Sequence, residues 1–186
     1  MSRLADPSPV KYFLAAFGRD ADLIEKAADR LGRAFHQGRL GNPDIILDRP
    51  FSETDYYEPE MGPGLIKRYL TWSNLGSPDL LPELKLQAME TEKEYARKAD
   101  GRLLRQVNLD PGYISAGGLV LSTGKFSGHR LYLGNRVWGE LTIHFHRGRF
   151  ESLPWTYRDY QSPEIVDLLT RMRKSYLAAV GRGEAL

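Results

Sequence analysis

The chain has 186 residues, of which 41% are hydrophobic and 27% are charged, and its net charge is +2. This composition is typical of a globular protein and argues against a disordered or fibrous chain. The sequence contains no cysteine, which excludes a thiol nucleophile, a zinc–thiolate cluster and an iron–sulfur centre. The nearly balanced charge argues against a dedicated nucleic-acid-binding protein.

The sequence carries no recognisable membrane or export signal. No apolar run approaches the ~20 residues that a membrane span needs. Residues 1–7 lead into polar sequence without the apolar core of a signal peptide. We therefore expect a cytoplasmic protein of the bacterial type, without a membrane partner.

The hydrophobic pattern predicts an alternation of strands and helices in the first 112 residues. Short apolar runs indicate four strands, at 10–17, 44–51, 65–72 and 104–109. Two amphipathic helices are expected between them, from Asp20 to Gly38 and from Ser77 to the Asp100-Gly101 pair. Asp110-Pro111-Gly112 is expected to close the fourth strand as a turn. The order β-α-β-β-α-β is that of a ferredoxin-like sandwich.

The second half is predicted to be mainly β. Strands are expected at 119–121, 129–133, 137–146 and 149–153, and a last helix at 162–181. Gly134-Asn135-Arg136 is a short hairpin connection. We predict an α+β fold with a ferredoxin-like βαββαβ start, followed by antiparallel strands and a C-terminal helix. One domain is expected over residues 1–186, with its core at 8–180, and its second half extends the first sheet or packs on it.

The polar loop at 54–64 contains three carboxylates and two phenols. Asp55, Glu58 and Glu60 are candidate metal ligands because hard cations prefer carboxylate oxygens, and Tyr57 is a candidate ligand-binding residue. No known coordination spacing is present, so a solvated, turn-rich connection is the preferred interpretation.

Asp110 and Glu140 are the candidate acid–base residues among the predicted strands. Asp110 ends a strand, where the alternative is an ordinary turn residue. Alternation along 137–146 places Glu140 on one face of its strand with Thr142, His144 and His146, and it places Val137, Leu141, Ile143 and Phe145 on the other. Two histidines and a glutamate could hold a metal, but a water-exposed sheet face is the preferred interpretation.

A loop rich in glycine and hydroxyl groups precedes the hairpin. Its Lys125, His129 and Arg130 are candidates for binding an anion, and His129 is also a candidate catalytic residue. The alternative is an exposed hairpin with solubilising charges. The loop is not a P-loop, because Leu119 stands where that motif needs glycine and Phe126 follows Lys125 in place of a hydroxyl residue.

Trp155 and Tyr157 lie in an aromatic loop before the last helix, where they could stack on a planar ligand or cover the end of the core. The sequence has no Gly-x-Ser-x-Gly, His-Glu-x-x-His or Gly-x-Gly-x-x-Gly motif. The motifs therefore identify neither a cofactor nor a reaction.

These polar segments, in this order, resemble the motifs of a bacterial family classed as a domain of unknown function (family 4416). The matching segments are 54–58, 60–65, 108–113, Lys125 with 129–134, 153–157 and 159–160. The resemblance extends over about Val10 to Tyr176 and implies one domain. Family members often carry the automatic label of GTP-binding protein, whereas this sequence has neither a P-loop nor an Asn-Lys-x-Asp motif.

Our leading hypothesis is a protein that binds or acts on a phosphorylated or nucleotide-like molecule. Lys125, His129 and Arg130 would hold the anion, Asp110 and Glu140 would act as acid–base groups or ion ligands, and the aromatic loop would stack on the ligand. This hypothesis requires the side chains to meet in one cleft.

Two other hypotheses remain from the sequence. One is a non-enzymatic module that binds RNA or protein, because a ferredoxin-like sheet can present aromatic side chains to bases. The absence of an RNP-like segment makes RNA the less favoured partner. The other is an oligomeric scaffold in which the polar segments are only structural turns.

Overall fold

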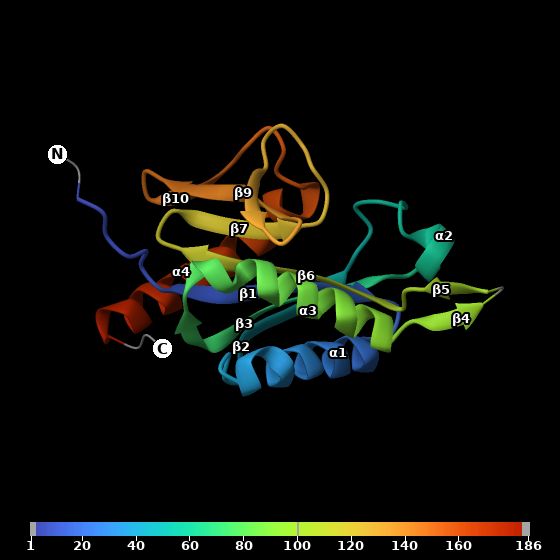
Figure 1. The fold of residues 1–186 in the computed structure, drawn as a ribbon. Helices are drawn as coiled ribbons and strands as arrows, with labels where there is room; N and C mark the ends of the chain where they lie inside the picture. The colour runs from blue at the N-terminus through green and yellow to red at the C-terminus, as the bar shows by residue number, and fades with distance from the viewer. Residues whose placement is uncertain (1–2, 100, 184–186) are drawn as a thin grey trace.

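The computed structural model describes residues 3–99 and 101–183, which form an α+β fold (Figure 1). The strands are β1 (Val10–Gly18), β2 (Pro43–Pro50), β3 (Ile66–Gly76), β4 (Arg97–Ala99), β5 (Arg102–Leu104), β6 (Val107–Ser115), β7 (Gly118–Thr123), β8 (Leu131–Gly134), β9 (Val137–His146) and β10 (Arg149–Ser152). The α-helices are α1 (Ala21–Ala34), α2 (Glu58–Met61), α3 (Leu81–Glu94) and α4 (Pro163–Gly181). Three short 3-10 helices lie at Phe35–Gln37, Pro78–Leu80 and Arg158–Gln161.

The first half has the predicted ferredoxin-like topology. Strands β6, β1, β3 and β2 lie side by side in that order, and each neighbouring pair is antiparallel. Counted along the chain these are strands 4-1-3-2, with α1 and α3 as the two connecting helices, which is the ferredoxin-like arrangement. The predicted fold class is therefore confirmed.

The β-rich half extends the first sheet. β7 pairs with β6, β9 with β7 and β10 with β9, all antiparallel, and β8 pairs with β9 beside this path. The hairpin between β8 and β9 turns at Asn135 and Arg136, with φ angles of 53° and 62°. Positive φ at both central residues matches the right-handed twist of the strands, as the sequence predicted.

Helices cover both faces of the ferredoxin-like part of the sheet (Figure 1). Helices α1 and α3 pack on one face over a core that includes Tyr12 and Leu14 of β1. Helix α4 packs on the opposite face over a core that includes Phe13 and Ala15, the alternate residues of the same strand. Because β1 is buried on both faces, it appears in the sequence as a continuous apolar run.

Helix α1 begins as the sequence predicts. The Asp20 side chain caps it by accepting hydrogen bonds from the backbone N–H groups of Asp22 and Leu23, at 2.9 and 3.2 Å. Within the described residues, no helix is both long and apolar enough to cross a membrane.

Two predicted element ends are wrong. Asp110-Pro111-Gly112 is not a turn but the middle of β6. Strand β6 pairs with β7 only from Gly112 onward, so a proline is tolerated at the point where that pairing stops. Helix α3 ends at Glu94 rather than near Asp100, which lies outside the described residues, and the strand pair β4 and β5 follows it.

The predicted alternation along β9 is also wrong. The register between β7 and β9 shifts so that Leu119 faces Ile143 and Leu121 faces Glu140. A β-bulge of this kind inserts one residue and reverses the facing of the residues before it. Glu140 therefore lies on the same face as Ile143, away from the face expected from its spacing to His144.

Candidate functional site

A cleft opens where β6 and β7 separate. Before Gly112, the edge of β6 that faces β7 has no neighbouring strand among the described residues. Helix α3 supplies hydrogen-bond partners for this edge in its place. The Leu109 N–H donates to Glu92 Oε1 at 2.6 Å, and Lys85 Nζ donates to the Leu109 carbonyl at 2.9 Å. These contacts satisfy a buried strand edge that pairing would otherwise satisfy.

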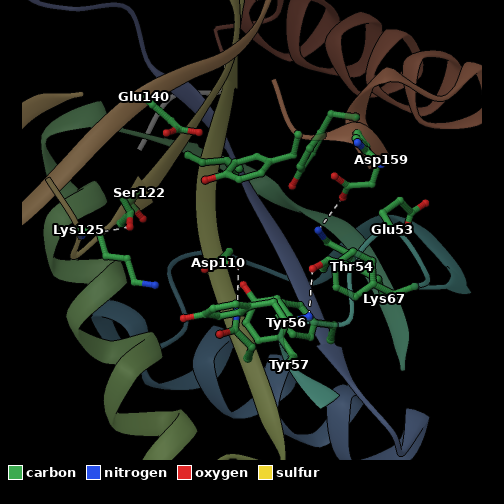
Figure 2. A pocket seen from close by; sticks show the side chains of 18 of the residues that line it. Glu53, Thr54, Tyr56, Tyr57, Lys67, Asp110, Ser122, Lys125, Glu140 and Asp159 are labelled. Carbon is green, nitrogen blue, oxygen red and sulfur yellow. Dashed lines mark hydrogen bonds and ion pairs between the residues drawn. The ribbon is translucent and has the colours of Figure 1, made fainter. Parts of the chain in front are cut away.

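The cleft has a volume of about 730 Å³ and is lined by segments from both halves of the chain. Its walls come from the loop before α2, from α3, from β6, from the end of β7 and from the loop before α4. Figure 2 shows Lys125 and Glu140 on one side of the cleft and Lys67 with Asp159 on the other. A cleft of this size accommodates a small organic molecule.

The structure brings most of the predicted site residues to this cleft. Seven of the eight candidate catalytic and ligand-binding residues line it: Tyr57, Asp110, Lys125, Arg130, Glu140, Trp155 and Tyr157. They come from five separate segments of the chain, and the convergence that the leading hypothesis requires is therefore present for them.

His129 is the candidate that lies behind the cleft wall. Its Nε2 lies 3.1 Å from Glu140 Oε2, and its ring stacks on Trp155 with 4.8 Å between ring centroids. His129 is not among the lining residues. Its position supports the Glu140 and Trp155 side chains rather than a direct contact with a ligand.

Glu140 is buried in the wall, with 2% of its side chain exposed. Its Oε2 accepts a hydrogen bond from Arg130 Nε at 2.7 Å as well as the His129 contact. Arg130 also donates to the Lys125 carbonyl at 2.9 Å and to the Tyr157 hydroxyl at 3.1 Å. The Arg130 guanidinium thus connects the loop that carries Lys125 to the aromatic loop that carries Tyr157.

Asp110 is held by a polar network along β6. Lys85 Nζ contacts its Oδ1 at 3.2 Å, and Asn108 donates to its Oδ2 at 2.8 Å. Arg105 in turn donates to Asn108 Oδ1 at 2.7 Å. Both carboxylate oxygens of Asp110 therefore have partners, so neither is free to act as a base in this geometry.

Lys67 and Asp159 form a buried ion pair that the sequence analysis missed. Lys67 Nζ lies 2.6 Å from Asp159 Oδ2, which also accepts a hydrogen bond from the Tyr69 hydroxyl at 2.7 Å. The ammonium lies 4.6–5.8 Å from the ring centroids of Phe17, Phe51, Tyr69 and Tyr160. Since 92 residues separate the two partners, no local motif could have revealed the pair.

Lys125 is a lining cation of a different kind. No carboxylate of residues 3–99 or 101–183 lies within ion-pair distance of its ammonium, and the same is true of Arg158. Lys125 Nζ lies 5.5 Å from the centroid of the Tyr56 ring. Both cations are exposed at the cleft and free to meet an anion.

Phenol groups in the cleft keep their protons. Burial, followed by the charge of Asp110, raises the pKa of Tyr57 to about 12. Burial and the Glu140 charge raise the pKa of Tyr157, and burial raises the pKa of Tyr160 well above its usual value. These hydroxyls act as neutral hydrogen-bonding groups at ordinary pH.

The carboxylates of the 54–64 loop do not assemble into a metal site. Glu60 accepts hydrogen bonds from Arg105, the shortest of them 2.6 Å from Nη2 to Oε2, and this contact lowers the pKa of Glu60. Asp55 and Glu58 line a separate pocket of about 220 Å³. Over the described part of the chain, no group of three or more histidine, aspartate or glutamate side chains could hold a metal ion.

The fold and the site together define an α+β protein whose ferredoxin-like sheet is extended by four further antiparallel strands and opened into one polar, aromatic cleft. The chain belongs to the family described as a domain of unknown function (DUF4416), whose model matches residues 8–176. Comparison with curated proteins and with solved structures gives no significant match.

Proposed function

We propose that this protein binds a phosphorylated, nucleotide-like small molecule in the cleft between β6 and β7. The observation that carries the proposal is the Lys125 ammonium, which has no carboxylate partner among the described residues and lies beside aromatic side chains in one cleft. A cation without a carboxylate partner attracts an anionic ligand, and aromatic faces favour a planar ring.

The anionic group of the ligand is expected near Lys125. Arg158 is a second exposed cation that lines the cleft. Thr123 and Gly124 lie directly before Lys125, and the Lys125 N–H is turned back onto the Thr123 hydroxyl at 3.2 Å. A phosphate at this position would meet side-chain cations in a region that water can reach.

The planar part of the ligand is expected among the tyrosines and Trp155. Trp155 is fixed by its stacking on His129 and by a hydrogen bond of 2.9 Å from its Nε1 to the Leu141 carbonyl. Tyr57 is fixed against Phe17, with 4.6 Å between ring centroids. Aromatic side chains that are already held in place lose little conformational freedom when a ring stacks on them.

The RNA-binding alternative is less well supported. Proteins that bind RNA on a ferredoxin-like sheet use an open face of those strands, whereas here α1 and α3 cover one face of the ferredoxin-like strands and α4 covers the other. A bounded cleft suits a small molecule better than a strand of nucleotides.

We also propose that the protein works in the bacterial cytoplasm, in accordance with its cysteine-free composition.

Calorimetric titration tests the proposal. The probes are the four common ribonucleoside 5′-monophosphates, the matching nucleosides and inorganic phosphate. We expect at least one monophosphate to bind more tightly than its nucleoside or phosphate alone. Lys125→Ala is expected to weaken that binding about tenfold or more, because it removes a charge-assisted contact.

Lys174→Ala is the matched control, since Lys174 is an exposed lysine of α4 that does not line the cleft. It should bind as the parent protein does. Absence of binding by every monophosphate, or equal affinities for the parent and Lys125→Ala, would contradict the proposal.

A further inference from the structure

One oxygen of the buried Glu140 carboxylate has no hydrogen-bond partner in the described part of the chain. Five buried side-chain polar atoms lack a hydrogen bond within the described residues, and Glu140 Oε1 is one of them. The other oxygen, Oε2, has both Arg130 and His129. A buried carboxylate oxygen without a hydrogen-bond donor is costly, so it requires an explanation.

The orientation of Glu140 is fixed by its surroundings. Arg130 and His129 hold Oε2 from the side of the β8–β9 hairpin, and the side chain lines the cleft. The Glu140 side chain therefore keeps one position in the cleft wall, beside Trp155 and Tyr157, which line the same cleft. A structural role as the partner of Arg130 uses Oε2 and leaves Oε1 unexplained.

A second unpartnered polar atom belongs to the same cleft. Tyr160 lines the cleft, and its hydroxyl is buried without a hydrogen-bond partner among the described residues. The remaining three atoms of this kind, on Arg49, Thr71 and Gln87, belong to residues that do not line it. Two unpartnered polar groups in one cleft indicate a ligand with its own polar edge.

We propose that Glu140 Oε1 accepts a hydrogen bond from a ring N–H or amino group of the ligand, and that Glu140 determines which heterocycle binds. This inference rests on the proposed function. An ionised carboxylate only accepts hydrogen bonds, so it selects rings that donate. The ligand class is therefore a phosphorylated heterocycle with an N–H donor, such as a nucleotide with an unmodified base.

The parent protein gives the first test. The probes are the four ribonucleoside 5′-monophosphates and analogues that keep the ribose and phosphate but have neither a ring N–H nor an amino donor. These analogues are the 5′-monophosphates of purine riboside, 2-pyrimidinone riboside and N3-methyluridine. We expect the best natural ligand to bind about 10- to 100-fold more tightly than its analogue, because the analogue leaves the Glu140 oxygen buried without a donor.

Glu140→Gln gives the second test. The amide oxygen is expected to take the place facing Arg130, which turns the amide NH₂ towards the cleft. This group donates where the carboxylate accepted, so the preference for the natural ligand should fall to about twofold or less, or reverse. Glu90→Gln on the exposed face of α3 is the control and should keep the parent preference.

The outcomes separate this inference from the proposed function. A strong preference in the parent that is lost in Glu140→Gln supports both. If monophosphates bind and Lys125→Ala weakens them, but natural ligand and analogue bind alike in the parent, the role of Glu140 is wrong and the proposed function stands. If no monophosphate binds, both are wrong. The parent comparison decides the question even if Glu140→Gln does not fold.

Discussion

The backbone N–H of Leu109 donates to the carboxylate of Glu92 at 2.6 Å, in the place where a neighbouring strand would accept it. Lys85 completes the arrangement by donating to the Leu109 carbonyl. Helix α3 thus substitutes for β7 along the edge of β6, which lets the sheet open into a cleft without leaving its backbone unsatisfied. Burial raises the pKa of Glu92, whereas Lys85 and the Leu109 N–H oppose this rise.

Removing the Lys85 ammonium should destabilise the fold. Lys85→Met leaves the buried Leu109 carbonyl without a donor and Asp110 without its cation, so we expect unfolding free energy to fall by about 1–3 kcal/mol. Urea unfolding followed by circular dichroism measures the change. Lys93→Met on the same helix removes only an exposed ion pair to Glu90 and should change stability by less than about 0.5 kcal/mol. Equal losses of stability in Lys85→Met and Lys93→Met would refute the role of Lys85 at the edge of β6.

Removing one partner of the buried Lys67–Asp159 ion pair should lower the unfolding free energy more than removing both partners. Lys67→Met leaves the Asp159 carboxylate buried without its cation, and we expect a loss of about 3–5 kcal/mol. The double variant Lys67→Met/Asp159→Asn removes the stranded charge and should recover part of this loss. Chemical denaturation of the two variants measures which of them has the lower unfolding free energy. A double variant less stable than Lys67→Met would show that the pair does not act as a unit.

The contact between Glu60 and Arg105 should stabilise the protein in a pH-dependent manner. Arg105 lowers the pKa of Glu60 in the folded state, so its contribution is present above the unfolded pKa of about 4.3 and is lost as pH falls through the lower folded pKa. We expect Glu60→Gln to cost about 1 kcal/mol at pH 7, after allowance for its partial exposure.

Denaturation of the parent and Glu60→Gln from pH 7 to pH 3 measures this linkage. The difference between them should shrink as the pH falls below about 4.3. A difference that stays constant over this range would mean that the Glu60 charge does not stabilise the fold.

Gly112 marks the point where β6 and β7 come together. A Cβ at Gly112 would overlap the carbonyl oxygen of Val120 on β7. Gly112→Ala should therefore cost about 1–3 kcal/mol through forced separation of the strands. Gly128→Ala is the control, because a Cβ there meets no atom within 4 Å. Thermal unfolding of both variants is the measurement, and a loss no larger than that of the control would contradict the tight strand contact.

The ferredoxin-like start could be predicted from sequence because it depends on local patterns. The continuous apolar run of β1 and the Asp20 cap of α1 each point to one structure. Local and tertiary preferences agree at these positions, which is why the prediction was confirmed. The single-domain prediction was not tested by any comparison and stays a prediction.

The errors arose where tertiary contacts override local preference. Asp110-Pro111-Gly112 has the composition of a turn, yet β1 pairs with it on one side. The Ser122 hydroxyl donates to the Pro111 carbonyl at 2.6 Å on the other. The bulge that turns Glu140 towards the cleft depends on the pairing of β9 with β7 and leaves no mark in the β9 sequence.

The candidate site was predicted only in part. Lys125 and Trp155 were found because polar and aromatic loops stand out against an apolar scaffold. Lys67 was missed because it lies within a strand that the sequence pattern identifies only as an apolar run. Its partner Asp159 is also distant in sequence. Its cleft position follows from the three-dimensional arrangement alone.

The most direct measurement is a crystal structure of the protein with the ribonucleoside 5′-monophosphate that binds most tightly. We expect density for the ligand between β6 and β7, with its phosphate in contact with Lys125 and its ring beside Trp155 or Tyr57. A ligand bound elsewhere on the surface, or a cleft without ligand density at saturating concentration, would contradict this expectation.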